Sequence, residues 1–89
     1  SYLFKPDYIL IDIRSPRDFR RRHIKGAVCI PYENLQDRVY LLRRKTLILY
    51  CERGSTSMKA ARELAEAGYR VLTLVGGIQS YKGRNLEQY

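Results

Sequence analysis

Four short segments of the chain are apolar at nearly every position, and they alternate with segments that have helical patterns. The four segments span residues 8–13, 27–30, 46–50 and 70–75. Successive side chains of a strand point to opposite faces, so a strand that is apolar throughout is buried on both faces. Such strands, alternating with helices, form a parallel sheet covered on both sides. We therefore predict an α/β fold: a small parallel sheet flanked by helices on both faces.

Between these strands, three segments favour helix. Ser15 is a good N-cap and Pro16 suits the first helical position, so a short helix is predicted over 16–21. Apolar residues recur at gaps of three and four over 32–42, which predicts a second helix. Segment 78–81 is expected to form one helical turn.

The strongest helical pattern lies over 58–67, and Gly68 is a typical residue just past a helix end. We expect this helix to begin near Ser57. Its apolar face is predicted to contain Ala61, Leu64, Ala65 and Gly68.

Length and cysteine content limit the class of protein. A chain of 89 residues has room for one domain, which we place over 1–89. Two cysteines and one histidine are too few for a disulfide scaffold or a zinc site, so no metal is expected. Free thiols indicate a reducing, cytoplasmic setting.

No apolar run reaches the roughly 20 residues that span a bilayer, and we expect no membrane association.

The chain is strongly basic. Its 17 Lys and Arg against 9 Asp and Glu give a net charge of +8. The basic residues form two clusters: Arg17, Arg20, Arg21, Arg22 and Lys25, then Arg43, Arg44 and Lys45. No nucleic-acid-binding motif accompanies them, so we do not expect nucleic acid as a partner. A positive surface attracts small anions, and that is the preferred interpretation.

One element has the composition of a reactive site. Cys51 follows the strand 46–50, and the polar segment to Ser57, which contains Gly54, leads into the helix. Ligands of parallel sheets bind beyond the carboxyl ends of the strands. Backbone N–H groups of such a loop and of a helix start can bind an anion and stabilise a thiolate. We therefore predict that Cys51 is a nucleophile acting on a small anionic substrate, the alternative being a buried structural cysteine.

Four segments together resemble the rhodanese-like domains, single-domain sulfurtransferases. They are Ile11-Asp12-Ile13-Arg14, Phe19 with His23–Pro31, Tyr50–Ser57, and Val75-Gly76-Gly77-Ile78 with Tyr81. They are similar to the family's Asp-x-Arg strand, His-Ile-x-Gly-Ala stretch, Cys-x-x-Gly-x-x-Ser loop and Gly-Gly-Ile ending. The resemblance covers about residues 8–83.

The resemblance implies a sulfurtransferase without a cofactor. Cys51 would take a sulfane sulfur from a small anionic donor, thiosulfate or a persulfide, as its own persulfide. A thiol, small or on a protein, or cyanide would then accept the sulfur. The substrate-binding residues implied are those of the loop: Glu52, Arg53, Gly54, Ser55, Thr56 and Ser57.

This chain also departs from the family pattern. Thr56 stands where many members have Arg, which leaves Arg53 as the only cation of the loop. Only seven residues precede Tyr8, and the usual C-terminal helix is cut near Leu86. Two alternatives follow: the domain is trimmed at its N- and C-termini, or it borrows packing from a partner.

Other polar residues are expected to be structural. His23 is assigned to packing and hydrogen bonding, and Cys29 to the core, with a resolving cysteine as the alternative. Asp12 and Arg14 are expected to anchor the strand end, although Arg14 could instead reach the anion.

Two other functions compete with sulfur transfer. A cysteine phosphatase loop needs an Arg after five intervening residues, and Ser57 occupies that position, which argues against a phosphatase. The other alternative is a non-catalytic rhodanese-fold module that docks a protein partner. The presence of Cys51 favours the enzyme.

Overall fold

The computed structural model describes residues 7–81 and 86–87. The strands of this part are β1 (Tyr8–Asp12), β2 (His23–Ile24), β3 (Val28–Cys29), β4 (Thr46–Tyr50), β5 (Arg70–Thr73) and β6 (Leu86–Glu87). The α-helices are α1 (Pro16–Arg21), α2 (Leu35–Arg38) and α3 (Ser55–Glu66). Short 3-10 segments cover Tyr32–Asn34, Val39–Leu42 and Ile78–Ser80.

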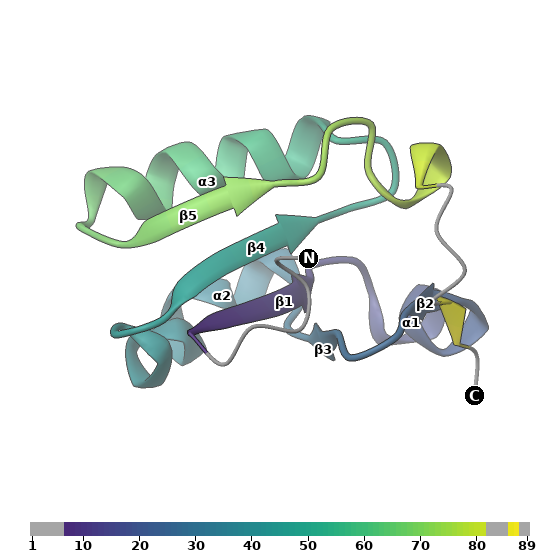
Figure 1. Ribbon diagram of the computed structural model, residues 1–89, viewed down its shortest axis with the longest axis horizontal. Coiled ribbons are helices and arrows are strands. Elements are labelled where there is room, and N and C mark those ends of the chain that lie inside the picture. The colour runs from purple at the N-terminus through teal and green to yellow at the C-terminus, as the bar shows by residue number, and fades with distance from the viewer. Residues whose placement is uncertain (1–6, 82–85, 88–89) are drawn as a thin grey trace.

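Four strands form the predicted parallel sheet, in the order β3-β1-β4-β5. Asp12 at the end of β1 lies between Cys29 of β3 and Tyr50 of β4. The carboxyl ends of these strands therefore meet at one edge, and Figure 1 shows β1, β4 and β5 pointing to the same side. At that side, β2 pairs in antiparallel fashion with β6.

The two faces of the sheet are covered unequally. On one face, α2 and α3 enclose the larger core, in which Leu35, Val39 and Leu64 pack against Ile11 and Leu49. The smaller core on the other face consists of Leu10, Ile24, Ile48, Tyr50 and Ile78. Two of its residues come from β2 and the 78–80 turn, so short segments rather than a long helix cover this face over the described residues.

The segment 32–42 is less regular than its pattern predicts. Only four of its residues, Leu35–Arg38, form α-helix, with 3-10 turns on either side. Leu35 and Val39 are its buried residues, whereas Tyr40 and Leu41 are exposed. Short helices need tertiary packing to form, and two buried anchors hold little more than one regular turn.

Helix α3 begins earlier than predicted, at Ser55 instead of near Ser57. Gly54 is its N-cap and has a φ of 108°, a left-handed conformation that glycine adopts readily. The first turn is polar, so apolar periodicity does not reveal it. Its buried residues are Ser57, Ala60 and Leu64. The predicted face is right for Leu64 and for the partly buried Ala61, and wrong for Ala65 and Gly68, which are exposed.

The strand β5 is not buried on both faces, which corrects the prediction for 70–75. Leu72 is 43% exposed, and Arg70 is exposed as well. Leu72 pairs with Ile48, so both point to the face of the smaller core, and no long helix covers that face over the described residues.

Both chain ends fall largely outside this description. The trimming expected at the termini concerns residues 1–6, 82–85 and 88–89, which lie outside the described residues. Within 7–81 and 86–87, no helix combines the length and apolar character needed to cross a membrane.

Tyr50 links the sheet to β2. Its hydroxyl accepts a hydrogen bond of 3.0 Å from the backbone N–H of Ile24, and the side chain is fully buried. Burial and the neighbouring Asp12 carboxylate raise the pKa of Tyr50, although the Ile24 N–H opposes them, so the phenol stays neutral.

Replacing Tyr50 with Phe is therefore expected to lower the free energy of unfolding by about 1–3 kcal/mol, because a buried N–H loses its acceptor. Urea denaturation measures the change. The matched control is Tyr40→Phe, since Tyr40 is 60% exposed. Equal stability of the two variants would contradict the role given to the Tyr50 hydroxyl.

Candidate active site at the Cys51 loop

Cys51 is the first residue after β4, at the edge of the sheet where the strand ends meet. Its side chain is buried, with 6% of the residue exposed. The chain then turns through Gly54 into α3, so Cys51 lies beneath the first turn of this helix. The sequence prediction of a strand, a cysteine, a short loop and a helix start is thus matched in order and in space.

The Cys51 sulfur lies within a ring of hydrogen-bond donors. The N–H of Gly54 is 3.1 Å from Sγ, and the N–H of Ser57 is 3.3 Å away. The thiol is also 3.5 Å from Ser57 Oγ, whose own hydroxyl donates to the carbonyl of Gly54. The sulfur therefore caps the helix, because it accepts the Ser57 N–H that the helix itself leaves unpaired.

These contacts stabilise the charged form of the sulfur. Burial disfavours the Cys51 thiolate, but hydrogen bonds from Ser57, Gly54 and Arg53 outweigh it and hold the pKa of the thiol below its ordinary value. The N-terminal end of a helix adds partial positive charge in the same direction. At Cys29, burial and the Asp12 charge raise the pKa instead. The pKa values of the two thiols are thus shifted in opposite directions.

The predicted binding residues of the loop other than Glu52 divide into an exposed group and a group that contacts the sulfur. The exposed group consists of Arg53, Ser55 and Thr56. The N–H groups of Ser55 and Thr56 belong to the first helical turn and have no acceptor within the helix. Of the predicted binding residues, Gly54 and Ser57 contact the sulfur directly.

Glu52 does not join this ring, although it follows Cys51 directly. Its carboxylate accepts a hydrogen bond of 3.0 Å from Arg14 Nη1 and another of 3.0 Å from Gln79 Nε2. Burial raises its pKa, but Gln79 and Arg14 lower it to a net value below the ordinary range. The carboxylate is therefore ionised, and Arg14 offsets the negative charge that would oppose a thiolate at Cys51.

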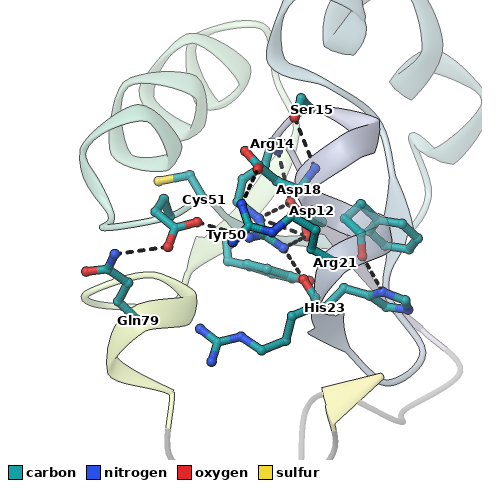
Figure 2. A network of polar contacts seen from close by, with 12 residues as sticks. Asp12, Arg14, Ser15, Asp18, Arg21, His23, Tyr50, Cys51 and Gln79 are labelled. Atoms are coloured by element: carbon teal, nitrogen blue, oxygen red, sulfur yellow. Dashed lines mark hydrogen bonds and ion pairs between the residues drawn. The ribbon is translucent and has the colours of Figure 1, made fainter. Parts of the chain in front are cut away.

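Arg14 connects three segments around the site (Figure 2). Its Nε and Nη2 atoms donate to the Asp12 carboxylate, with Nη2 at 2.8 Å from Oδ2. Nη2 also donates to the carbonyl of Arg22, and Nη1 binds Glu52. The exposed fraction of the Arg14 side chain is only 7%, and that of Asp12 is 0%. Arg14 thus anchors the strand end, and its donors are already engaged, which argues against the alternative that it binds the anion.

The Gly76-Gly77 turn holds the Cys51 backbone in place. Ile78 donates its N–H to the carbonyl of Cys51 at 2.9 Å, and Gln79 donates to the carbonyl of Glu52 at 3.1 Å. A Cβ atom on Gly77 would lie 2.5 Å from the Cys51 carbonyl oxygen, so only glycine allows this approach. The sequence analysis identified the glycine pair as part of the family resemblance, but not its contact with the cysteine.

His23 and Cys29 lie outside the reactive ring. His23 is 1% exposed, and its ring stacks on the Phe19 ring with 3.7 Å between the ring centroids. Its Nδ1 atom is 2.7 Å from the Phe19 carbonyl oxygen. These contacts match the expected role in packing and hydrogen bonding. Cys29 is half-buried and its sulfur is 3.8 Å from the carbonyl of Arg14. It belongs to neither core cluster, so its assignment to the core was wrong.

A resolving role for Cys29 has no geometric support. Cys29 and Tyr50 flank Asp12 on opposite sides, two strand spacings apart. Two spacings put the Cα atoms of Cys29 and Tyr50 about 9.5 Å apart, and Cys51 is the residue after Tyr50. Disulfide-bonded residues have Cα atoms about 4.4–6.8 Å apart, so this separation argues against a bond between Cys29 and Cys51.

Comparison with known proteins agrees with the fold. The family model described as "Rhodanese-like domain" matches residues 2–84. A tRNA sulfurtransferase of Desulfurococcus amylolyticus is 36% identical over 76 residues, 85% of this chain but 15% of that protein. The thiosulfate sulfurtransferase PspE of Escherichia coli is 31% identical over 72 residues, 78% of this chain and 69% of that protein.

A solved structure of a rhodanese-related protein from Thermoplasma volcanium superposes with a TM-score of 0.84 at 27% identity, covering 93% of this chain and 86% of that one. The chain belongs to the rhodanese-like domain family. Named relatives place it with sulfurtransferases at the level of the family.

The contrast between the two thiols leads to a pH prediction. Alkylation by iodoacetamide requires the thiolate, so the rate rises through the pKa and levels off above it. Because the pKa is lowered at Cys51 and raised at Cys29, the midpoint for Cys51 is expected at the lower pH. Ser57→Ala should move only the Cys51 midpoint upward. Site-resolved mass spectrometry measures both, and coincident midpoints would refute the assigned electrostatics.

The glycine turn gives a second prediction. Gly77→Ala must push the Cys51–Glu52 backbone away, and should therefore shift the alkylation midpoint of Cys51. Gly68→Ala is the matched control, since Gly68 also has a positive φ but would place its Cβ in open space. Alanine is strained at both positions because φ is positive, and more so at Gly77, whose ψ of −162° lies in a region that essentially only glycine adopts. A Cys51 midpoint that is unchanged in Gly77→Ala would show that the turn does not position the sulfur.

Proposed function

We propose that this protein transfers sulfane sulfur through a persulfide on Cys51. The observation that carries the proposal is the ring of donors around Sγ: the N–H groups of Gly54 and Ser57 stabilise a thiolate at the start of α3. A thiolate at a helix N-terminus is a strong nucleophile that also faces groups suited to anions. Family membership and the named relatives support the same class of reaction.

In the first half-reaction, the Cys51 thiolate attacks the outer sulfur of thiosulfate. A bond forms between Sγ and that sulfur, the S–S bond of thiosulfate breaks, and sulfite leaves with the electron pair. The negative charge moves to the new outer sulfur of the persulfide. To the donor and the persulfide we assign the backbone N–H groups of the exposed residues Ser55 and Thr56, together with the Arg53 cation.

In the second half-reaction, an acceptor attacks the outer sulfur of the persulfide. With cyanide, thiocyanate leaves and the electron pair of the broken S–S bond returns to Sγ. The thiolate is regenerated in the ring that held it before, so the cycle needs no metal or cofactor. Such a ping-pong cycle splits one transfer into two displacements.

Ser57 has a specific part in this cycle. In the thiol form, Sγ–H donates to Ser57 Oγ, while the serine hydroxyl donates to the carbonyl of Gly54. When the thiol ionises, the serine hydroxyl can rotate and donate to the sulfur. One hydroxyl thus serves both protonation states.

Free thiols at Cys51 and Cys29 fit a reducing compartment, and we propose the cytoplasm.

The test is thiocyanate formation from thiosulfate and cyanide, measured for the wild-type protein, Cys51→Ser and Cys29→Ser. Cys51→Ser is expected to reduce turnover to the uncatalysed rate, because a serine hydroxyl cannot carry the persulfide. Cys29→Ser should retain most of the activity, since Cys29 lies two strands away. Turnover by Cys51→Ser at the wild-type rate would contradict the proposal. Absence of turnover with both thiosulfate and a persulfide donor would favour a module that binds a partner without catalysis.

A further inference from the structure

A groove that no step of the sulfur transfer uses lies at the opposite end of β4 from Cys51. Its volume is about 290 Å³, and its lining consists of the consecutive residues Tyr40, Leu41, Leu42, Arg43, Arg44 and Lys45. These residues connect the 3-10 segment Val39–Leu42 to the start of β4, and we call the feature the amino-end groove. Figure 1 places this connection at the end of the sheet from which the arrows of β4 and β5 point away.

One half of the lining is apolar and exposed to solvent. Tyr40 is 60% exposed and Leu41 is 76% exposed. Leu42, between them and the basic residues, is partly buried and packs against the larger core. Large apolar side chains that are exposed side by side, next to charged residues, are typical of a surface that binds another molecule.

The other half of the lining is basic, and its backbone is held in place. Arg43, Arg44 and Lys45 bring three positive charges, and among the described residues no carboxylate lines the groove. The Arg44 carbonyl accepts a hydrogen bond of 2.8 Å from Arg70 Nη2. The Arg43 guanidinium lies 5.0 Å from the ring centroid of Tyr69. Both contacts tie the segment to the start of β5, so part of the groove's shape exists before any partner binds.

The size and the lining of the groove limit what fits. Sites for whole small molecules have volumes of about 300–1,000 Å³. The groove is at the lower limit of that range and is formed by a single stretch of chain, so it suits one large side chain. An apolar side chain can pack against Tyr40 and Leu41. Carboxylates next to it can bind the guanidinium groups of Arg43 and Arg44 through paired hydrogen bonds.

Charge argues against an occupant from this protein itself. A second copy of the chain also has a net charge of +8 and is repelled. Residues 1–6 of the same chain include Lys5 and no acidic residue, so their charge does not complement the groove either. The complementary occupant is therefore an acidic molecule other than this chain.

The apolar half of the lining separates the remaining acidic partners. Nucleic acid binds through cations and through bases that stack on aromatic rings, which leaves the aliphatic Leu41 unused. Membrane-surface anchors place their apolar side chains along a regular amphipathic helix, whereas this segment is a 3-10 turn followed by a bend. An acidic protein segment with an apolar side chain matches both halves of the lining.

We propose that the amino-end groove docks an acidic segment of a partner protein, with one large apolar side chain of that segment against Tyr40 and Leu41. The inference goes beyond sulfur transfer and does not depend on it. The five residues of β4 lie between the groove and Cys51 and span about 16 Å. A partner docked here therefore leaves the Cys51 loop open.

The test is fluorescence anisotropy with a labelled peptide that has one phenylalanine between two pairs of acidic residues. A control peptide has serine in place of the phenylalanine and keeps the same charge. At low ionic strength, the wild-type protein is expected to bind the phenylalanine peptide about fivefold more tightly than the control peptide. Equal affinity for the two peptides would mean that net charge alone attracts them, and would overturn the proposal.

Leu41→Ser and Arg44→Gln should each weaken binding of the phenylalanine peptide about fivefold. Both side chains are exposed, so neither variant should disturb the fold. The matched controls are Met58→Ser, which removes a 60% exposed apolar side chain from α3, and Arg20→Gln, which removes the same charge from α1. Control variants that weaken binding equally would place the peptide elsewhere and refute the assigned groove.

The bound peptide should also leave sulfur transfer unaffected. At a saturating peptide concentration, thiocyanate formation is expected to proceed at the rate of the free protein, because β4 separates the groove from Cys51. Inhibition would show that the peptide occupies the Cys51 loop, and would overturn the groove without contradicting the transfer. The binding measurements need no turnover, so they decide the groove even where the proposed transfer fails.

Other occupants are tested with the same variants. Vesicles of phosphatidylserine and phosphatidylcholine, or a single-stranded oligonucleotide, would take the place of the protein partner if they bound in a Leu41-dependent way and the peptide did not. A wild-type dimer in sedimentation velocity that dissociates in Leu41→Ser would assign the groove to a second copy. Tighter peptide binding by the full chain with Leu3→Ser and Phe4→Ser would assign it to the chain's own N-terminal segment. Each of these results would overturn the proposal.

Discussion

Two backbone hydrogen bonds, from Ile78 to the Cys51 carbonyl and from Gln79 to the Glu52 carbonyl, fix the segment on which the site depends. They join the end of β4 to the turn after β5, and they form only because Gly77 allows the two backbones to approach. With the backbone held in this position, Sγ lies against the first turn of α3, where the N–H groups of Gly54 and Ser57 contact it. Stabilisation of the thiolate is thus a consequence of backbone geometry more than of any nearby cation.

A second constraint controls charge around that sulfur. Glu52 would repel a thiolate, but Arg14 binds it and is itself held by the buried Asp12. The same arginine also donates to the carbonyl of Arg22, the residue after α1. One buried ion pair therefore neutralises the charge beside the nucleophile and shapes the neighbouring surface.

The sequence predicts the parallel sheet and the position of Cys51 because both depend on local patterns. Continuous apolar runs identify buried strands, and the Gly54-containing loop indicates a turn into a helix. The early start of α3 was missed because its first turn is polar and capped by the sulfur, not by a side-chain oxygen. The broken helix in 32–42 and the exposed β5 were missed because both depend on tertiary packing. The direction of Glu52 was also beyond reach, since Arg14 and Gln79 are distant in sequence.

The most direct test of the account is the intact mass of the reduced protein after brief exposure to a sulfane-sulfur donor, with peptide mapping. The account predicts a gain of one sulfur atom that maps to the Cys51 peptide, disappears on addition of cyanide and is absent from Cys51→Ser. A sulfur that maps to Cys29, or that persists in Cys51→Ser, would contradict the central claim that the ring formed by Gly54 and Ser57 makes Cys51 the sulfur carrier.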